Sequence, residues 1–257
     1  DIDAAEIGKN VHVTIPLIGD AKQILGILLN KFKNISNLKK NKSWLDHTAK
    51  LKQSFILPEF REEDPIKPPR LMKELRDLLP KDAIITTEVG QNQMWTAIYF
   101  KAYLPRTFIS SGGLGTMGFG FPAALGAKMA KFGAPVIAIA GDGSFLMNEH
   151  ELATSVEENI PVVVVILDNR ALGMVAQWQR TLYRRYSQVH LGNIPDFVKL
   201  AEAYGAHGVR VESYGEFRKA VREALRNTVT TVIDVPIPSE ENVEPIKLPK
   251  GLSVPAG

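Results

Sequence analysis

Two polar motifs each follow an apolar run that is typical of a buried strand. The residues at 141–144 read Gly-Asp-Gly-Ser and come directly after the apolar run 136–140, while Asp168 and Asn169 follow the run 162–167. A stretch of helical length separates the two motifs. The carboxylate of Asp142 and the amide of Asn169 are therefore expected at the ends of two strands. Such a pair suits a divalent cation that holds a diphosphate.

Magnesium is the cation that this pair of side chains favours. Mg²⁺ prefers octahedral oxygen ligands, takes few of them from the protein and receives the rest from phosphate and water. Asp142, the side-chain oxygen of Asn169 and one backbone carbonyl would suit it. Either motif alone is also explained by local structure, with Asp142 as a helix N-cap and Asp168-Asn169 as a turn. The pair, placed on neighbouring strands, favours the metal site.

Short apolar runs alternate with helical patterns along most of the chain, and this alternation predicts an α/β fold with a doubly wound parallel sheet. The expected strands are 83–87, 136–140, 161–167, 208–211 and 231–235, and the expected helices are 71–79, 91–101, 117–131, 149–158, one from about 172, and 214–226. Ligands bind beyond the carboxyl ends of such strands, where the glycine-containing loops 88–91, 141–144 and 168–173 are expected. Helix N-termini after these loops would present N–H groups to phosphate oxygens.

The first seventy residues follow a different pattern. Val11–Pro16 alternates like a short strand, and residues 21–32 have helical spacing with Asp20 as a plausible N-cap. Charges and four prolines then indicate a linker. We expect the end of one domain at 1–41, the linker at 42–69, the sheet domain at 70–235 and a C-terminal arm at 236–257. Because the start of the chain is typical of a compact unit already under way at residue 1, we expect a fragment of a longer polypeptide, with a natural stand-alone subunit as the alternative.

Composition restricts the class of protein. The 257 residues are 45% hydrophobic and 23% charged, with a net charge of +3 and no cysteine. The absence of cysteine excludes disulfides and a thiolate nucleophile. The small net charge argues against a nucleic-acid partner, and the basic stretch 31–42 is interpreted as a solvated helix end. No apolar run reaches the length of a membrane span and no signal peptide opens the chain, so a cytoplasmic protein is expected.

Several long motifs, in the right order, carry a resemblance to a known family. A Gly-Asp-Gly motif followed 25 to 30 residues later by an Asn pair is the thiamin-diphosphate motif, and here Asp168 replaces the first Asn while Asn169 is retained. The segments 89–95, 110–118 and 172–178 resemble the catalytic large subunit of acetohydroxyacid synthase (acetolactate synthase). The resemblance extends through 185–187 and 193–205 and covers nearly the whole chain.

The resemblance implies a role for each matching position. Mg²⁺ would be bound by Asp142, Asn169 and the carbonyl of Ala171. The carbonyl of Gly115 would accept a hydrogen bond from the aminopyrimidine of the cofactor, and Met117 would wedge between its two rings, although a methionine at such a helix start is by default a core residue. The remaining cofactor contacts implied are Val89, Gly90, Gln91, Asn92, Gly141, Gly143, Ser144, Gly173 and Met174.

Met174 and Trp178 lie at helical spacing and would, with Met117, form the reacting end of the site. By resemblance, Trp178 lines the pocket for the second 2-keto acid and favours 2-ketobutyrate over pyruvate. Taken alone, Trp178 is more typical of a packing residue than of a substrate contact.

The N-terminal segment resembles the end of a central FAD-binding domain of the same family. Asp1 would bind ribose hydroxyls and Asp20 would lie near the flavin nucleotide. The glutamate that protonates the pyrimidine in this family belongs to a domain of the partner subunit that no segment here resembles, and Glu88 does not match it. The chain alone is therefore expected to be inactive.

The implied activity is condensation of pyruvate-derived hydroxyethyl-thiamin diphosphate with a second 2-keto acid in branched-chain amino-acid biosynthesis. The implied cofactors are thiamin diphosphate, Mg²⁺ and FAD. The implied partners are pyruvate, 2-ketobutyrate, a second copy in a homodimer or tetramer, and a regulatory small subunit. The alternatives are another thiamin-diphosphate enzyme, such as a pyruvate oxidase or a sulfoacetaldehyde acetyltransferase, and a cofactor-binding fragment without activity.

Overall fold

The structure is a computed structural model that describes residues 1–33, 35, 41–54 and 61–244. The chain divides into two compact units, Asp1–Ile56 and Leu57–Gly257. In the described part of the chain, no helix is both long enough and apolar enough to span a bilayer.

The first unit is helical. It contains a 3-10 turn, η1 (Ala4–Glu6), and two α-helices, α1 (Ala21–Lys33) and α2 (Lys42–Ser54), the second of which lies within the range expected to be a linker. The carboxylate of Asp20 accepts a hydrogen bond from the Gln23 N–H at 3.0 Å, so the expected N-cap is confirmed. The prediction of a strand at residues 11–16 is wrong. A strand requires a neighbouring strand to pair with, and no described segment pairs with these residues.

The second unit is built on a six-stranded sheet in which every pairing is parallel, so the expected fold class is confirmed. The strand order is β2-β1-β3-β4-β6-β5. The strands are β1 (Ile84–Thr87), β2 (Phe108–Ser110), β3 (Val136–Gly141), β4 (Val163–Asp168), β5 (His207–Arg210) and β6 (Thr231–Pro236). Strand β2 was not predicted; it is a three-residue edge strand that is only half buried.

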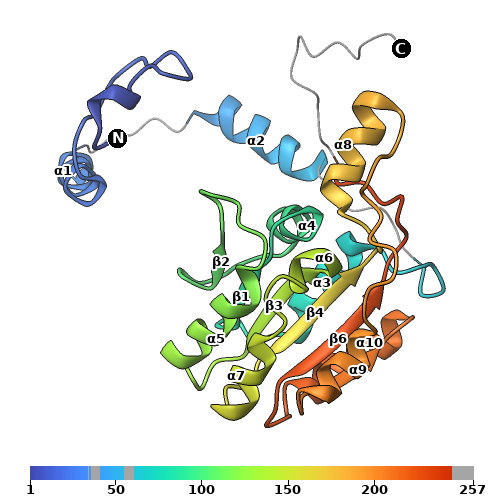
Figure 1. The fold of residues 1–257 in the computed structure, drawn as a ribbon. Helices are drawn as coiled ribbons and strands as arrows, with labels where there is room; N and C mark the ends of the chain where they lie inside the picture. The colour runs from blue at the N-terminus through green and yellow to red at the C-terminus, as the bar shows by residue number, and fades with distance from the viewer. Residues whose placement is uncertain (34, 36–40, 55–60, 245–257) are drawn as a thin grey trace. The chain divides into compact units, whose positions relative to one another are not determined.

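Helices cover both faces of this sheet (Figure 1). One face carries α3 (Pro68–Leu78), α4 (Gln91–Tyr99) and α10 (Tyr214–Ala224). The other carries α5 (Gly120–Ala130), α6 (Asp142–Phe145), α7 (Glu151–Glu157) and α9 (Phe197–Ala203), of which α6 and α9 were not expected. Helix α8 (Gly173–Tyr183) follows β4.

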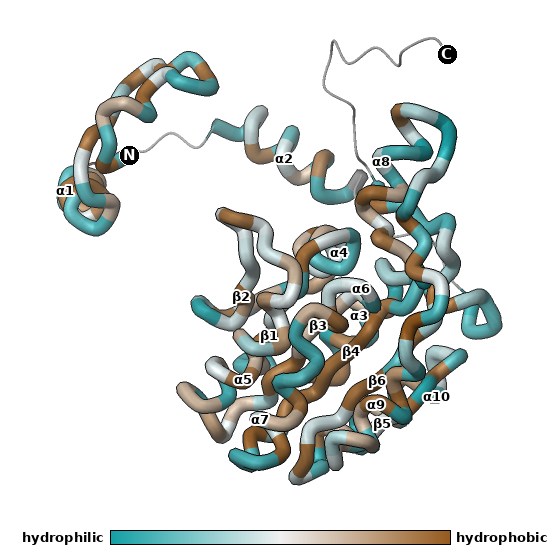
Figure 2. Tube along the Cα trace, viewed as in Figure 1, coloured by the Kyte–Doolittle hydropathy of each residue, from teal (hydrophilic) through white to brown (hydrophobic). Residues whose placement is uncertain are grey.

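Strand residues divide between two apolar cores with a period of two. Ile137 and Ile139 of β3 pack toward α3, α4 and α10, whereas Val136, Ala138 and Ala140 pack toward α5, α7 and α9. Figure 2 shows the central strands as a continuous brown band. A strand that is buried on both faces is apolar at every position, which is why these runs were recognisable in the sequence.

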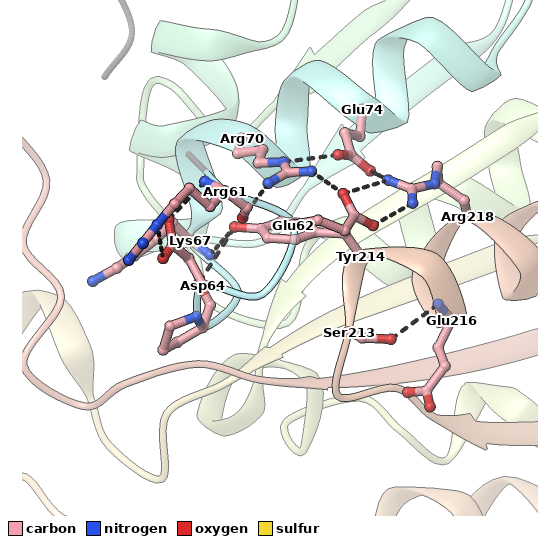
Figure 3. Close-up of polar contacts among 11 residues, drawn as sticks. Arg61, Glu62, Asp64, Lys67, Arg70, Glu74, Ser213, Tyr214, Glu216 and Arg218 are labelled. Carbon is pink, nitrogen blue, oxygen red and sulfur yellow. Dashed lines mark hydrogen bonds and ion pairs between the residues drawn. The ribbon is translucent and has the colours of Figure 1, made fainter. Parts of the chain in front are cut away.

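A charged cluster fixes the segment before α3 onto α10 (Figure 3). Arg70 and Arg218 both pair with Glu62 and with Glu74, the latter at 2.8 and 3.0 Å. The Arg70 guanidinium lies 3.7 Å from the centroid of the Tyr214 ring. Both cations therefore have a carboxylate on each side, and the cluster is internally satisfied.

Candidate cofactor-binding site

A pocket lies at the carboxyl ends of three adjacent strands, β1, β3 and β4. The ladder pairs Gly141 with Leu167, which places Asp142 beside Asp168 as the sequence predicts. The pocket is lined by residues from all three strand ends and from α4 and α8, namely Val89, Gly90, Gln91, Asn92, Trp95, Met117, Gly141, Asp142, Gly143, Ser144, Leu167, Asn169, Ala171, Leu172, Gly173, Met174 and Val175.

Asp142 is buried, with an exposed fraction of 2%. Its Oδ1 accepts a hydrogen bond from the Gly143 N–H at 2.7 Å, whereas its Oδ2 is buried without a partner. Burial, with the adjacent Asp168 carboxyl, raises the pKa of Asp142 to about 7. An unpartnered carboxylate oxygen in a buried site is costly unless a ligand or an ion satisfies it.

The loop after β4 holds Asn169 in a defined orientation. Asn169 Oδ1 accepts from the Ala171 N–H and its Nδ2 donates to Gln91 Oε1, both at 3.2 Å. Asp168 accepts from the backbone and the side chain of Arg170 at 3.1 Å, and Arg170 adopts a left-handed φ of 56°. Ala171 forms an antiparallel bridge with His190. Asn169 and Ala171 line the same pocket as Asp142, and the Asn169 side chain is held in one orientation there.

Gln91 connects the loop after β1 to α8 and to the C-terminal arm. Its Nε2 donates to Gln177 Oε1 and to the Glu241 carbonyl, each at 2.8 Å. Gln177 in turn exchanges two hydrogen bonds with the backbone of Val243, at 2.9 and 3.1 Å. Gln177 and these arm contacts were not predicted, because nothing in the local sequence pattern distinguishes them from ordinary polar residues.

Glycines let the backbone approach closely around the pocket. Gly90 has φ +133° and precedes α4, whose N-terminus receives no side-chain cap. A Cβ atom on Gly173 would lie 2.1 Å from Gln91 Oε1 and 2.6 Å from Asn169 Nδ2, so a larger residue there would displace these two side chains. Asn92 Oδ1, like Asp142 Oδ2, is buried without a partner.

The loop at residues 115–118 contributes one residue to the pocket lining. Gly115 and Gly118 have φ of +66° and +86°, and Met117 lines the pocket. The Gly118 N–H donates to the Glu88 carboxylate at 2.7 Å and its carbonyl accepts from Asn148 at 2.7 Å. Glu88 and Asn148 were not predicted as site residues. The only signal in the sequence was a glutamate directly after a run that predicts a buried strand.

The structure brings together most, but not all, of the predicted site residues. Gly115 and Trp178 are outside the pocket lining, and Trp178 is half buried on α8. Asp1 and Asp20 belong to the first unit, where the Gly19 N–H donates to the Asp1 carbonyl at 2.9 Å. The predicted roles of these four residues remain predictions.

The donor set fits a divalent cation with a diphosphate. Within the described residues, no group of three or more His, Cys, Asp or Glu side chains could hold a metal ion. A cation here would therefore depend on one carboxylate, one amide oxygen and one carbonyl, with phosphate oxygens completing its shell. The unpartnered oxygens of Asp142 and Asn92 are consistent with a ligand in this pocket.

Asp234 lies on β6, opposite Ile166 of β4, and its electrostatic environment can be tested by the pH dependence of stability. Burial, and then the nearby Asp168 carboxylate, raise the pKa of Asp234 to about 6 from its ordinary 3.8, although Arg210 donates to it at 2.7 Å. The folded state binds this proton more tightly than the unfolded chain, so the free energy of unfolding falls as the pH rises from about 4 to about 6.

We therefore expect Asp234→Asn to raise the free energy of unfolding at pH 8 by about 1–2 kcal/mol and to flatten its dependence between pH 4 and 6. Urea unfolding at pH 4.5 and pH 8 measures both. Asp77→Asn, at an exposed position of α3, is the control. A variant that is less stable than wild type at pH 8 would show that the Arg210 ion pair outweighs the cost of burial.

Residues 88–235, more than half of the chain, match the family described as "Thiamine pyrophosphate enzyme, C-terminal TPP binding domain". The fold and the site thus define a diphosphate-cofactor domain, and the chain belongs to the thiamine pyrophosphate enzymes. The resemblance expected from the motifs is confirmed.

Among curated proteins the chain is similar to acetolactate synthase large subunits. A probable acetolactate synthase large subunit of Methanocaldococcus jannaschii is 51% identical over 248 residues, which cover 94% of this chain and 42% of that protein. The isozyme 3 large subunit of Escherichia coli (strain K12) is 41% identical over 258 residues, which cover 98% of this chain and 45% of that protein. The chain thus spans less than half of the length of these relatives.

Proposed function

We propose that the chain is the cofactor-binding part of an acetolactate synthase large subunit, an enzyme of branched-chain amino-acid biosynthesis that joins a two-carbon unit from pyruvate to a second 2-keto acid. The single observation that supports it best is the pocket beyond β1, β3 and β4, in which the Asp142 and Asn92 side chains leave buried oxygens unpartnered. The similarity to named large subunits supports the specific reaction.

In this proposal Asp142, Asn169 and the Ala171 carbonyl hold Mg²⁺. The backbone N–H groups at the start of α4, with backbone groups of Gly143 and Ser144, would contact the diphosphate, since a helix N-terminus without a side-chain cap favours an anion. Thiamin diphosphate, when bound, supplies the electron sink that decarboxylation of a 2-keto acid requires. The residues of this chain orient the cofactor and exclude water around it.

The 115–118 loop and α8 are assigned to the reacting end. Met117 would contact the cofactor between its two rings, and the Gly115 carbonyl would accept a hydrogen bond from the aminopyrimidine. Met174 lines the pocket on the α8 side, and Trp178 follows one turn later on the same helix. A large aromatic side chain there favours 2-ketobutyrate as the second substrate.

The test is product analysis on the complete enzyme that contains this sequence. Given pyruvate and 2-ketobutyrate together, we expect acetohydroxybutyrate to form alongside acetolactate, and acetolactate alone from pyruvate. Omission of Mg²⁺ is the control and should abolish both products. Formation of acetyl phosphate from pyruvate as the main product would instead place the enzyme among the pyruvate oxidases.

FAD, a homodimer or tetramer and a small regulatory subunit are further parts of the proposal. Asp1 and Asp20 are the FAD candidates, supported by the hydrogen bond that holds Gly19 against Asp1. The small subunit is suggested by relatives that are named large subunits. Flavin absorbance in the purified enzyme, and its mass by light scattering, test these assignments.

A further inference from the structure

Glu88 is a completely buried carboxylate to which the proposed reaction assigns no role. It follows β1 directly, and its exposed fraction is 0%. Its Oε2 accepts from the Gly118 N–H at 2.7 Å and its Oε1 accepts from the Phe121 N–H at 3.0 Å. Burial raises the pKa of Glu88, and the hydrogen bonds from backbone N–H groups of residues 118–121 oppose this rise.

This carboxylate supplies the N-terminal cap that α5 lacks locally. Helix α5 begins at Gly120, and the side chain of Phe119 makes no capping hydrogen bond. The first N–H groups of a helix need acceptors, and a carboxylate at this end also interacts favourably with the helix dipole. Glu88 reaches these groups from a different element, so the start of α5 is tied to the end of β1.

A second side chain fixes the same turn from the other side. Asn148 Nδ2 donates to the Gly118 carbonyl at 2.7 Å, so both backbone groups of Gly118 are held by side chains. Asn148 follows α6, the segment that begins with Asp142. The 115–118 loop is therefore connected both to the strand end that precedes the diphosphate loop and to the segment that carries the metal ligand.

We propose that Glu88 and Asn148 are positioning residues that hold the 115–118 loop, and with it Met117 and the Gly115 carbonyl, at a fixed distance from the diphosphate end of the pocket. This inference rests on the proposed function, in which that loop contacts the rings of the cofactor. The Glu88 backbone is held separately, because its N–H donates to the Ile139 carbonyl at 2.8 Å. A change of the Glu88 side chain should thus disturb the loop and spare the diphosphate site.

The test compares two probes, thiamin diphosphate and inorganic pyrophosphate, each with Mg²⁺, by titration calorimetry on the complete enzyme. Glu88→Gln keeps the size of the side chain but replaces one carboxylate oxygen with an NH₂ group. This group donates hydrogen bonds and cannot accept one from a backbone N–H. We expect its affinity for thiamin diphosphate to fall about 10- to 100-fold, and its affinity for pyrophosphate to change less than about 2-fold. Asn148→Ala should act in the same direction with a smaller effect. Glu149→Gln, which removes a charge beside Asn148, is the control.

Hydrogen exchange at the amides of Gly118 and Phe121 provides a second readout, and Glu88→Gln should speed it at both positions. Equal loss of affinity for the two probes, or unchanged affinity and exchange, would overturn the positioning role while leaving the proposed function intact. Failure of the wild-type enzyme to bind either probe would instead count against the proposed function, and the exchange rates would still decide whether Glu88 holds the loop.

Discussion

Asp142→Asn is expected to weaken Mg²⁺-dependent binding of thiamin diphosphate by at least about 100-fold while leaving the melting temperature unchanged or higher. The carboxylate would contribute the negative ligand, and an amide of the same size cannot replace its charge. The free protein loses nothing, because Asp142 Oδ2 has no partner and the pair with Asp168 is repulsive when both groups are ionised.

Titration calorimetry with Mg²⁺ and thiamin diphosphate measures the affinity, and scanning calorimetry without ligand measures the melting temperature. Asp77→Asn on α3 is the control for the change of charge. An unchanged affinity in Asp142→Asn would refute the metal assignment. A large drop in melting temperature would show that the carboxylate is structural.

Gly120→Ala is expected to lower the free energy of unfolding by about 3 kcal/mol. A Cβ atom there would lie 2.5 Å from the Glu88 backbone nitrogen and 2.6 Å from the Thr87 carbonyl carbon. Neither atom can move without breaking the sheet, because Glu88 and Thr87 are part of the β1–β3 ladder. The start of α5 must therefore shift away from the strand.

Gly126→Ala, on the same helix, is the matched comparison. Nothing lies within 4 Å of the position that its Cβ atom would occupy, and the residue is exposed. We expect this substitution to raise the free energy of unfolding by about 0.5–1 kcal/mol, because alanine loses less backbone entropy in a helix. Urea unfolding of both variants measures the opposite signs, and two effects of equal size and sign would contradict the packing explanation.

The central sheet was predictable because of where its residues lie. Strands β3 and β4 are buried on both faces, so runs such as 162–167 are apolar throughout and stand out in the sequence. Strand β2 has three half-buried residues at the edge of the sheet and leaves no such run. Residues 11–16 show the reverse case, since a local alternation predicts a strand that no neighbour pairs with.

The same distinction applies to the site. Asp142, Asn169 and Gly90 are local features of loops after apolar runs, so their type and spacing indicate the diphosphate site. Glu88 and Gln177 act through partners 33 and 66 residues away. Their roles depend on which elements meet in three dimensions, and one sequence does not specify those distances.

The hydrogen bonds of the Gln91 side chain link Asn169 to α8 and to the C-terminal arm. Its oxygen accepts from Asn169, while its nitrogen donates to Gln177 and to the arm at Glu241. One planar amide thus serves the proposed metal ligand Asn169 and the arm at once, and it cannot rotate to improve one contact without loss of the other. A ligand that held Asn169 in this orientation would therefore also favour the arm contact at Glu241, and by linkage that contact would tighten the ligand by the same factor.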